Sequence, residues 1–397
     1  MFALLPAADL EKPFLPFSKP TFDDDEIQEV IQCLKSGWIT TGPRVQKFEE
    51  DLKNYLNCPH VLTLTSGTAG LYIALKALDL HENDEVITTA FTFVATLNTI
   101  VMAGAKPILV DIDPKTYNID ISEVEKAITP KTRVILPVHF AGLSVDLDPL
   151  YALAKKHNLI ILEDAAQAIG TRYKNKMIGE FGDMQVFSFH PNKNMTTIEG
   201  GALSLHHDKF VKRLSTARFH GIDRDIWDRF TKKGSQHYDV VEPALKFNMS
   251  DVQAGLGIHQ LKKLEGFIDK REKLANRYFE KLKGWSELFL PPHPQNFDHK
   301  HSWHLFAPCL NIEYVGFSRD DLIQKMKDLG IGIGLHYDAP HLFTYYQKTF
   351  GYKIGDFPHT EWVSDRIFSL PLFPLMTEEE QDRVIEGLAH IFNKTIS

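Results

Sequence analysis

Cysteine is scarce in this sequence. The 397 residues include three cysteines, Cys33, Cys58 and Cys309, which lie far apart and lack the spacing of a metal site. An odd number of widely spaced cysteines fits a reducing compartment and no disulfide framework. We therefore expect all three to be packing residues.

The sequence also lacks an excess of positive charge. Lys and Arg total 44 against 52 Asp and Glu, which gives a formal net charge of −8 at pH 7. This balance argues against a general electrostatic attraction to nucleic acid or to an anionic membrane. An anionic ligand must therefore bind in a local pocket lined by basic groups or main-chain amides.

Long apolar runs are missing as well. No run approaches the roughly 18 residues needed to span a bilayer. The first ten residues have no Lys or Arg before their short apolar stretch, unlike a secretory signal. We expect a soluble, cytoplasmic protein with no membrane or nucleic-acid partner, long enough for one large domain and a smaller one.

Short apolar runs alternate with helical patterns through the first half of the chain. Helices are predicted over Asp23 to Gly37, Leu71 to Leu78 and Leu150 to His157. Parallel strands need crossover helices, so the alternation predicts an α/β fold with a mostly parallel central sheet covered by helices on both faces. Ligands bind at the carboxyl ends of the strands in such folds. The predicted strands are Val61 to Thr65, Glu85 to Thr89, Pro107 to Asp111, Arg133 to Val138, Leu159 to Leu162, Gln185 to Phe189 and Ala202 to Leu205.

The pattern changes after about Leu261. A long charged helix is predicted over Leu261 to Leu282, and a strand over Leu305 to Leu310. Two capping boxes, Ser318 with Asp321 and Thr377 with Glu380, predict the starts of two more helices. We place a large domain at residues 1–260 and a smaller C-terminal α+β domain at residues 261–397.

Two segments contain polar residues at predicted strand ends. Ser66 to Gly70 joins a predicted strand to a predicted helix, where main-chain amides can hold a phosphate. A turn of small residues chosen for packing explains this segment equally well. Farther along, Glu163 and Asp164 follow a buried strand, and Asp164 either reaches into the crevice or caps the next helix.

Lys193 follows another buried strand, in a segment of small and apolar residues. Burial lowers the pKa of an amine and makes it a nucleophile, although most lysines are solvated surface groups. A phosphate cradle, Asp164 and Lys193 together form the set that holds pyridoxal phosphate. The lysine bonds to the aldehyde, the aspartate pairs with the ring nitrogen, and the amides bind the phosphate. We predict this cofactor.

At these residues the sequence resembles the DegT/DnrJ/EryC1/StrS sugar aminotransferases, which are fold-type I enzymes that use pyridoxal phosphate. The resemblance runs over nearly the whole chain and follows the family's order of motifs. It implies a transferase that works in two half-reactions. The matching segments are Ser36 to Pro43, Ser66 to Thr68, Glu163 to Gln167 and Phe187 to Lys193.

The resemblance implies a role for each matched residue. Lys193 and Asp164 are the catalytic pair, and Phe93 stacks on the cofactor ring, although a core position is the usual fate of a Phe. Asn248 reaches the phosphate from the second subunit, which implies a homodimer with shared active sites. The other implied cofactor contacts are Gly67, Thr68, Gln167 and Ser188.

Four further segments are similar to the members that make UDP-4-amino-4-deoxy-L-arabinose for lipid A modification: His190 beside the lysine, His301 to Phe306, Gly334 to Tyr337 and Ser369 to Pro374. This likeness implies that L-glutamate, which leaves as 2-oxoglutarate, gives its amino group to the 4-keto group of a UDP-linked pentose.

Two residues depart from those members, which have Trp in place of Phe93 and His in place of Gln167. A UDP-4-keto-6-deoxyhexose is therefore the alternative substrate. A sugar dehydratase, which would carry His in place of Lys193, and a non-catalytic binding protein, which would usually carry a DNA-binding domain, are less favoured.

Two clusters of histidines and cations have competing interpretations. His293, His299, His301 and His304 share a loop without Cys or carboxylate ligands at a known spacing, so we expect substrate contact or packing rather than a metal. The stretch with Arg218, His220, Arg224, Arg229, Lys232 and Lys233 suits a nucleotide diphosphate, and a solvated surface explains it nearly as well. The predicted substrate contacts are His190, His220, Arg224 and His336.

Overall fold

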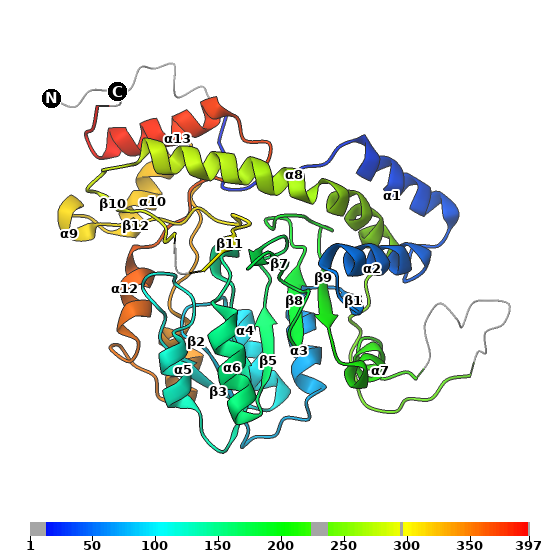
Figure 1. The fold of residues 1–397 in the computed structure, drawn as a ribbon. Coiled ribbons are helices and arrows are strands. Elements are labelled where there is room, and N and C mark those ends of the chain that lie inside the picture. The colour runs from blue at the N-terminus through cyan, green and yellow to red at the C-terminus, as the bar shows by residue number, and fades with distance from the viewer. Residues whose placement is uncertain (1–12, 224–236, 294–296, 396–397) are drawn as a thin grey trace.

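A seven-stranded sheet forms the centre of the computed structural model, which describes residues 13–223, 237–293 and 297–395 (Figure 1). Strand β9 alone among the seven runs antiparallel to its neighbours. The mostly parallel sheet predicted from the sequence is confirmed. Its order is β1 (His60–Leu64), β9 (Gly201–Leu205), β8 (Met184–Ser188), β5 (Ile160–Asp164), β4 (Thr132–Leu136), β2 (Glu85–Thr89) and β3 (Lys106–Val110).

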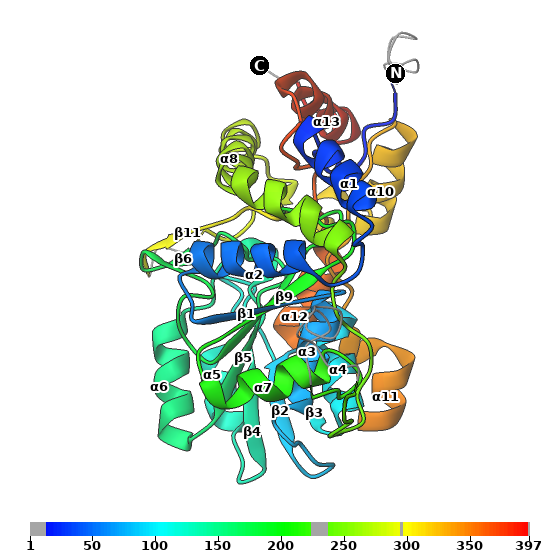
Figure 2. The ribbon, with the colours of Figure 1, turned by 90° about the vertical axis from the view of Figure 1, so that its right-hand side faces the viewer.

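Helices cover both faces of this sheet, because its strands are apolar on both sides and both sides must be shielded from water. One face packs against α5 (Ile121–Ala127) and α6 (Leu147–His157), and the other against α3 (Gly67–Lys76), α4 (Val94–Ala103) and α7 (Asp208–Ala217). Figure 2 shows these two layers on opposite sides of the strands. Helix α2 (Pro43–Leu56) joins the core of the first face.

Most of the C-terminal third packs over the end of the sheet toward which the parallel strands point (Figure 1), but α11 (Thr344–Phe350) packs beside the sheet, against β3 and α4. A separate apolar core joins two of its helices, α10 (Arg319–Asp328) and α13 (Glu378–Ile391), to α8 (Asp251–Lys281). Its other elements are β10 (Leu288–Phe289), β12 (Cys309–Leu310), α9 (Ile312–Val315) and α12 (Pro358–Arg366). Strands β6 (Arg172–Tyr173), β7 (Lys176–Met177) and β11 (His299–Lys300) form a small sheet, and α1 (Asp24–Ser36) lies near α8.

Several local predictions are confirmed. Helix α1 begins after Asp23, whose side chain accepts from the N–H of Asp25, and ends at Gly37 in the left-handed conformation. Both predicted capping boxes are present, at the starts of α10 and α13. The three cysteines are buried and free. No helix in the described ranges is long and apolar enough to cross a membrane.

Two local predictions are wrong. The long helix starts at Asp251, ten residues before the predicted start, because Ser250 and Gln253 form a capping box and the glycines that follow pack against α1 and α2. The predicted strand over Leu305 to Leu310 is reduced to two residues and isolated bridges, since Pro308 has no N–H to donate to a ladder.

Candidate active site

A cavity of about 370 Å³ opens at the carboxyl ends of β5 and β8. The polar residues of the predicted site that line it come from segments far apart in the sequence, as expected for the crevice of an α/β sheet. A loop from the C-terminal third, Leu335 to Tyr337, forms part of its wall. The predicted residues in the lining are Gly67, Thr68, Phe93, Asp164, Gln167, Ser188, His190, Lys193 and His336.

Lys193 lies in a turn that follows β8, where its N–H donates to the carbonyl oxygen of His190 at 2.9 Å. Burial in the cavity wall lowers the pKa of its amine to about 8, although the nearby Asp164 carboxylate acts in the opposite direction. Desolvation therefore outweighs the attraction of one anion. A much larger fraction of Lys193 is neutral near pH 7 than of a surface lysine.

Asp164 ends β5, and its carboxylate is held by donors on both oxygens. Oδ1 accepts from the N–H of Ala166 at 3.1 Å, and Oδ2 accepts from the hydroxyl of Thr96 at 2.8 Å. Burial raises the pKa of Asp164, and these two hydrogen bonds oppose the rise. The residues after Asp164 form turns rather than a helix, so the alternative of a helix cap is wrong.

The start of α3 forms a cradle of main-chain amides. Ser66 caps the helix by accepting from the N–H of Ala69 at 3.1 Å, which leaves the amides of Gly67 and Thr68 at the cavity wall. A Cβ atom at Gly201, the first residue of β9, would lie 2.5 Å from the nitrogen of Gly67, so only a glycine lets β9 approach the start of α3 this closely. This geometry suits a phosphate group.

Phe93 is 55% exposed although it is a large apolar residue, because its ring faces the cavity. The core position considered for it is wrong. Its ring centroid lies 5.7 Å from that of Tyr337, whose hydroxyl accepts a hydrogen bond of 2.5 Å from Nε2 of Gln167. The cavity therefore contains an aromatic face on which a planar ring can stack.

Glu163, next to Asp164, points to the other face of β5, as alternation along a strand requires. It accepts hydrogen bonds from Tyr151 at 2.6 Å and from Gln185 at 2.8 Å. Because Nδ1 of His139 accepts from the N–H of Val145, its Nε2 carries the proton and donates to Glu163 at 2.8 Å. Glu163 thus fixes the end of the strand that carries Asp164.

The predicted substrate contacts divide into three groups. His190 and His336 line the cavity, and burial together with Lys193 lowers the pKa of His336 to about 3, so its ring is neutral. His220 is described but is not among the lining residues, and the same holds for Asn248, whose Nδ2 donates to Thr41 at 2.7 Å. Arg224 lies outside the described residues.

The structure bears on both the histidine loop and the basic stretch, whose roles the sequence left open. His301 stacks on Trp303 with ring centroids 3.9 Å apart, which favours packing, and no metal-ligand group of three or more is found within the described part of the chain. In the basic stretch, Arg218 pairs with Glu49. Arg229, Lys232 and Lys233 lie outside the described residues.

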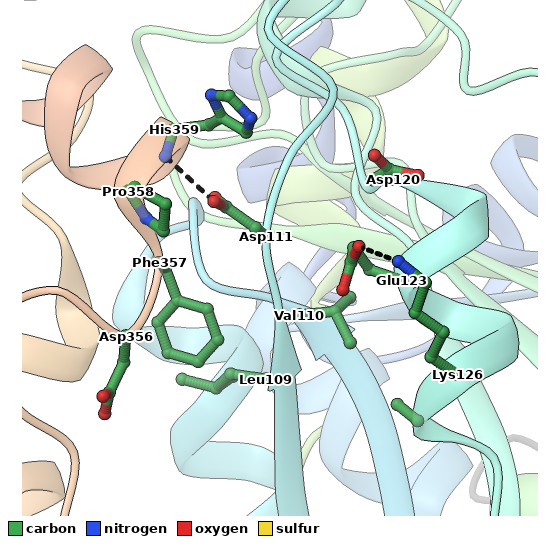
Figure 3. A pocket seen from close by; sticks show the side chains of 11 residues that line it. Leu109, Val110, Asp111, Asp120, Glu123, Lys126, Asp356, Phe357, Pro358 and His359 are labelled. Carbon is green, nitrogen blue, oxygen red and sulfur yellow. Dashed lines mark hydrogen bonds and ion pairs between the residues drawn. The ribbon is translucent and has the colours of Figure 1, made fainter.

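A second hollow of about 420 Å³ lies beside the end of β3, and four of its eleven lining residues are acidic (Figure 3). Asp111 accepts from the N–H groups of His359 and Thr360 at 2.9 and 2.8 Å, so it caps α12. Glu123 pairs with Lys126 at 2.7 Å. Since Asp111 caps a helix and Glu123 is paired with Lys126, we assign no ligand to this hollow.

Sequence reasoning missed three residues of the site. Tyr337 and Thr92 line the cavity, and Thr96 contacts Asp164 behind the cavity wall. Tyr337 lies within a segment that matched the family, which is a hint of its place. Nothing in the local sequence distinguishes the two threonines from ordinary helix-start residues.

The fold and the cavity define a class of protein. An amide cradle at a helix start, a buried carboxylate, an amine of lowered pKa and an open aromatic face fit the phosphate, ring nitrogen, aldehyde and ring of pyridoxal phosphate. A mostly parallel sheet with this arrangement at its carboxyl ends is that of a fold-type I transferase dependent on pyridoxal phosphate.

The comparisons with known proteins agree. The model of the DegT/DnrJ/EryC1/StrS aminotransferase family matches residues 20–389, and the chain belongs to this family. It is 41% identical over 382 residues to the spore coat polysaccharide biosynthesis protein SpsC of Bacillus subtilis, covering 95% of this chain and 97% of that one.

Solved structures are similar over almost their full length. The putative sugar aminotransferase Spr1654 from Streptococcus pneumoniae in its PLP form has a TM-score of 0.87 at 33% identity, covering 96% of this chain and 99% of that one. The same protein in its PMP form has a TM-score of 0.88. Helicobacter pylori PseC, an aminotransferase involved in pseudoaminic acid biosynthesis, has a TM-score of 0.88 at 29% identity, covering 96% and 100%. This chain is a sugar aminotransferase whose cofactor is pyridoxal phosphate.

Proposed function

We propose that this chain transfers the amino group of L-glutamate to the 4-keto group of a UDP-linked sugar, with Lys193 and Asp164 as its catalytic residues. The observation that carries the proposal is that both side chains line one cavity with the amide cradle of α3. When bound, pyridoxal phosphate supplies an aldehyde that bonds to amines and a ring that withdraws electrons from the carbon attached to the nitrogen.

The residues around that group have separate tasks. Lys193 would hold the group through its aldehyde. Its free amine would take a proton at Nζ from the donor carbon and give that proton to the cofactor, which requires a neutral amine. Asp164 would stabilise a proton on the ring nitrogen. The amides of Gly67 and Thr68, together with Ser188, would hold the phosphate, and Phe93 and Gln167 would contact the ring.

The same residues serve two half-reactions, because the amino sugar forms by the reverse of the steps that consume glutamate. The keto sugar can enter only after 2-oxoglutarate has left, so ping-pong kinetics are expected. His190 and His336 lie on the cavity wall beside Lys193, where the sugar must approach. His336 is neutral there, so it can form hydrogen bonds without repelling a protonated lysine.

The proposed sugar is a 4-keto pentose, giving UDP-4-amino-4-deoxy-L-arabinose. Its support is the likeness of His301 to Phe306 and Gly334 to Tyr337 to the members that make this product. The second candidate is a 4-keto-6-deoxyhexose, because Phe93 and Gln167 depart from the members that make the pentose product. The purified protein is assayed with glutamate and each UDP-4-keto sugar. If only the hexose is aminated, the pentose assignment is wrong and the reaction class stands.

We also propose that the active enzyme is a homodimer in which Asn248 reaches the phosphate of the other subunit. Exposed apolar side chains flank the relevant segments in the chain: Ile198 follows Lys193, and Val240, Val241 and Leu245 precede Asn248. Each is more than half exposed in the single chain. Apolar surface of this kind is what a subunit contact buries.

A further inference from the structure

The carboxylate of Asp164 is held by a side chain from a different element. Thr96 lies in the first turn of α4, is fully buried, and donates its hydroxyl to Oδ2 of Asp164 at 2.8 Å. The other oxygen, Oδ1, accepts from the N–H of Ala166. The two carboxylate oxygens therefore have distinct donors, one from a helix and one from the local turn.

A second hydroxyl determines the direction of this contact. Oγ1 of Thr92 lies 2.8 Å from Oγ1 of Thr96. A hydroxyl has one hydrogen to donate, and the hydrogen of Thr96 goes to Asp164. Thr96 must therefore accept from Thr92, so the chain runs from Thr92 at the cavity wall through Thr96 to the carboxylate.

We propose that Thr96, oriented by Thr92, is a positioning residue that fixes the carboxylate of Asp164 for contact with the ring nitrogen of the cofactor. The terminal torsion of an Asp side chain is broad, so a carboxylate without a fixed partner rotates. A carboxylate accepts about four hydrogen bonds, and two protein donors leave capacity for the ring N–H. The inference rests on the proposed role of Asp164.

The charge of the carboxylate matters as much as its direction. Burial favours the protonated acid, and the hydroxyl of Thr96 favours the anion. The other titratable groups that act on Asp164 or respond to it are Lys193, His139 and Tyr337, and they come from three other segments. Thr96 is a neutral donor, so it supports the anion without competing for the proton.

The test measures binding of pyridoxamine phosphate to the full chain freed of cofactor. A second ligand is the analogue in which a C–H replaces the ring nitrogen. Thr96→Val removes the donor at nearly constant shape and should weaken pyridoxamine phosphate about tenfold while changing the affinity of the analogue less than about twofold. Equal losses for both ligands, or no loss for either, would overturn the inference.

Three further variants separate the explanations. Thr96→Ser keeps the hydroxyl and should recover most of the affinity. Thr99→Val removes another buried hydroxyl of α4, which donates to the main-chain oxygen of Thr96, and should match the wild type for both ligands. Asp164→Asn should give a loss at least as large as Thr96→Val and equally specific to the ring nitrogen. If Asp164→Asn weakens pyridoxamine phosphate more than the analogue and Thr96→Val does not, the inference about Thr96 is wrong while the proposed role of Asp164 stands. If neither variant affects the two ligands differently, both the inference about Thr96 and the proposed role of Asp164 are wrong.

Discussion

At the scale of single residues, burial determines how Lys193 reacts. Its pKa is lowered from the usual 10.5 to about 8 by desolvation. Only the neutral amine attacks an aldehyde, and the neutral fraction grows as pH rises toward the pKa. The rate at which the cofactor-free protein captures pyridoxal phosphate should rise about tenfold per pH unit up to about pH 8 and then level off.

Stopped-flow absorbance of the bound cofactor gives this rate. Asp164 raises the pKa of Lys193, so Asp164→Asn should move the midpoint of the profile below that of the wild type. Free Nα-acetyl-lysine provides the comparison, since its rate should continue to rise to about pH 10.4. A protein profile with the same midpoint as the free amine contradicts the burial of Lys193.

Phe93 provides the second prediction at this scale. Its exposed ring faces the cavity, and an offset stack of aromatic rings stabilises by about 0.5–1.5 kcal/mol beyond area burial. Phe93→Ala should weaken binding of pyridoxamine phosphate about tenfold, and Phe93→Trp should retain it. Equilibrium fluorescence titration measures both. Unchanged affinity in Phe93→Ala would show that the ring does not stack there.

At the scale of elements, the packing of α8 on α2 depends on Gly257. A Cβ atom at this position would lie 2.4 Å from the buried ring of Phe48. Crowding of a packed core costs about 1–3 kcal/mol, which exceeds the gain of about 1 kcal/mol in helix propensity. Gly257→Ala should therefore lower the free energy of unfolding, measured by urea denaturation.

Gly266 is the matched control in the same helix. It is exposed, and a Cβ atom there would meet nothing within 4 Å. Gly266→Ala should stabilise the protein by about 0.5–1 kcal/mol because it lowers the entropy of the unfolded chain. Equal effects of the two substitutions would contradict close packing at Gly257.

The elements that could be predicted from sequence are those with strong local patterns. All seven strands of the central sheet lie within two residues of their predicted bounds, because strands buried on both faces are short apolar runs. The start of α8 could not be predicted so well. Gly255 and Gly257 look like helix breakers, and their use becomes clear only when α1 and α2 are seen against them.

Some residues of the site could likewise be predicted from sequence, and others could not. Lys193 and Asp164 come after recognisable strands, so their place at the carboxyl ends of the sheet's strands could be predicted. Thr96 is different, because its contact with Asp164 joins residues 68 positions apart and depends on how α4 approaches β5. Tyr337 reaches the cavity through a loop of the C-terminal third, and only the family likeness of its segment hints at that place.

At the scale of the whole molecule, we propose a large domain at residues 1–260 and a small one at 261–397, with α8 crossing the boundary. The proposed dimer predicts complementation between two damaged chains. In this dimer each site uses Lys193 of one subunit and Asn248 of the other. A hybrid of one Lys193→Ala chain and one Asn248→Ala chain therefore contains one site with both residues intact. After equal mixing and reassortment, about a quarter of all sites should be intact.

The measurement is the transaminase activity of each variant alone and of the refolded mixture. The mixture should recover about a quarter of the wild-type activity, well above the mean of the two variants. A mixture that gives only the mean of its components would place Asn248 in the same subunit as its site, or outside the site altogether. Sedimentation of the wild type gives the subunit number independently.

The most direct test of the central claim is to locate the cofactor on the chain. The protein loaded with pyridoxal phosphate is reduced with borohydride, digested, and its peptides are mapped by mass spectrometry. We predict one phosphopyridoxyl group, on Lys193, and loss of both the adduct and transamination in Lys193→Ala. An adduct on another lysine, or transamination that persists in Lys193→Ala, would contradict the account.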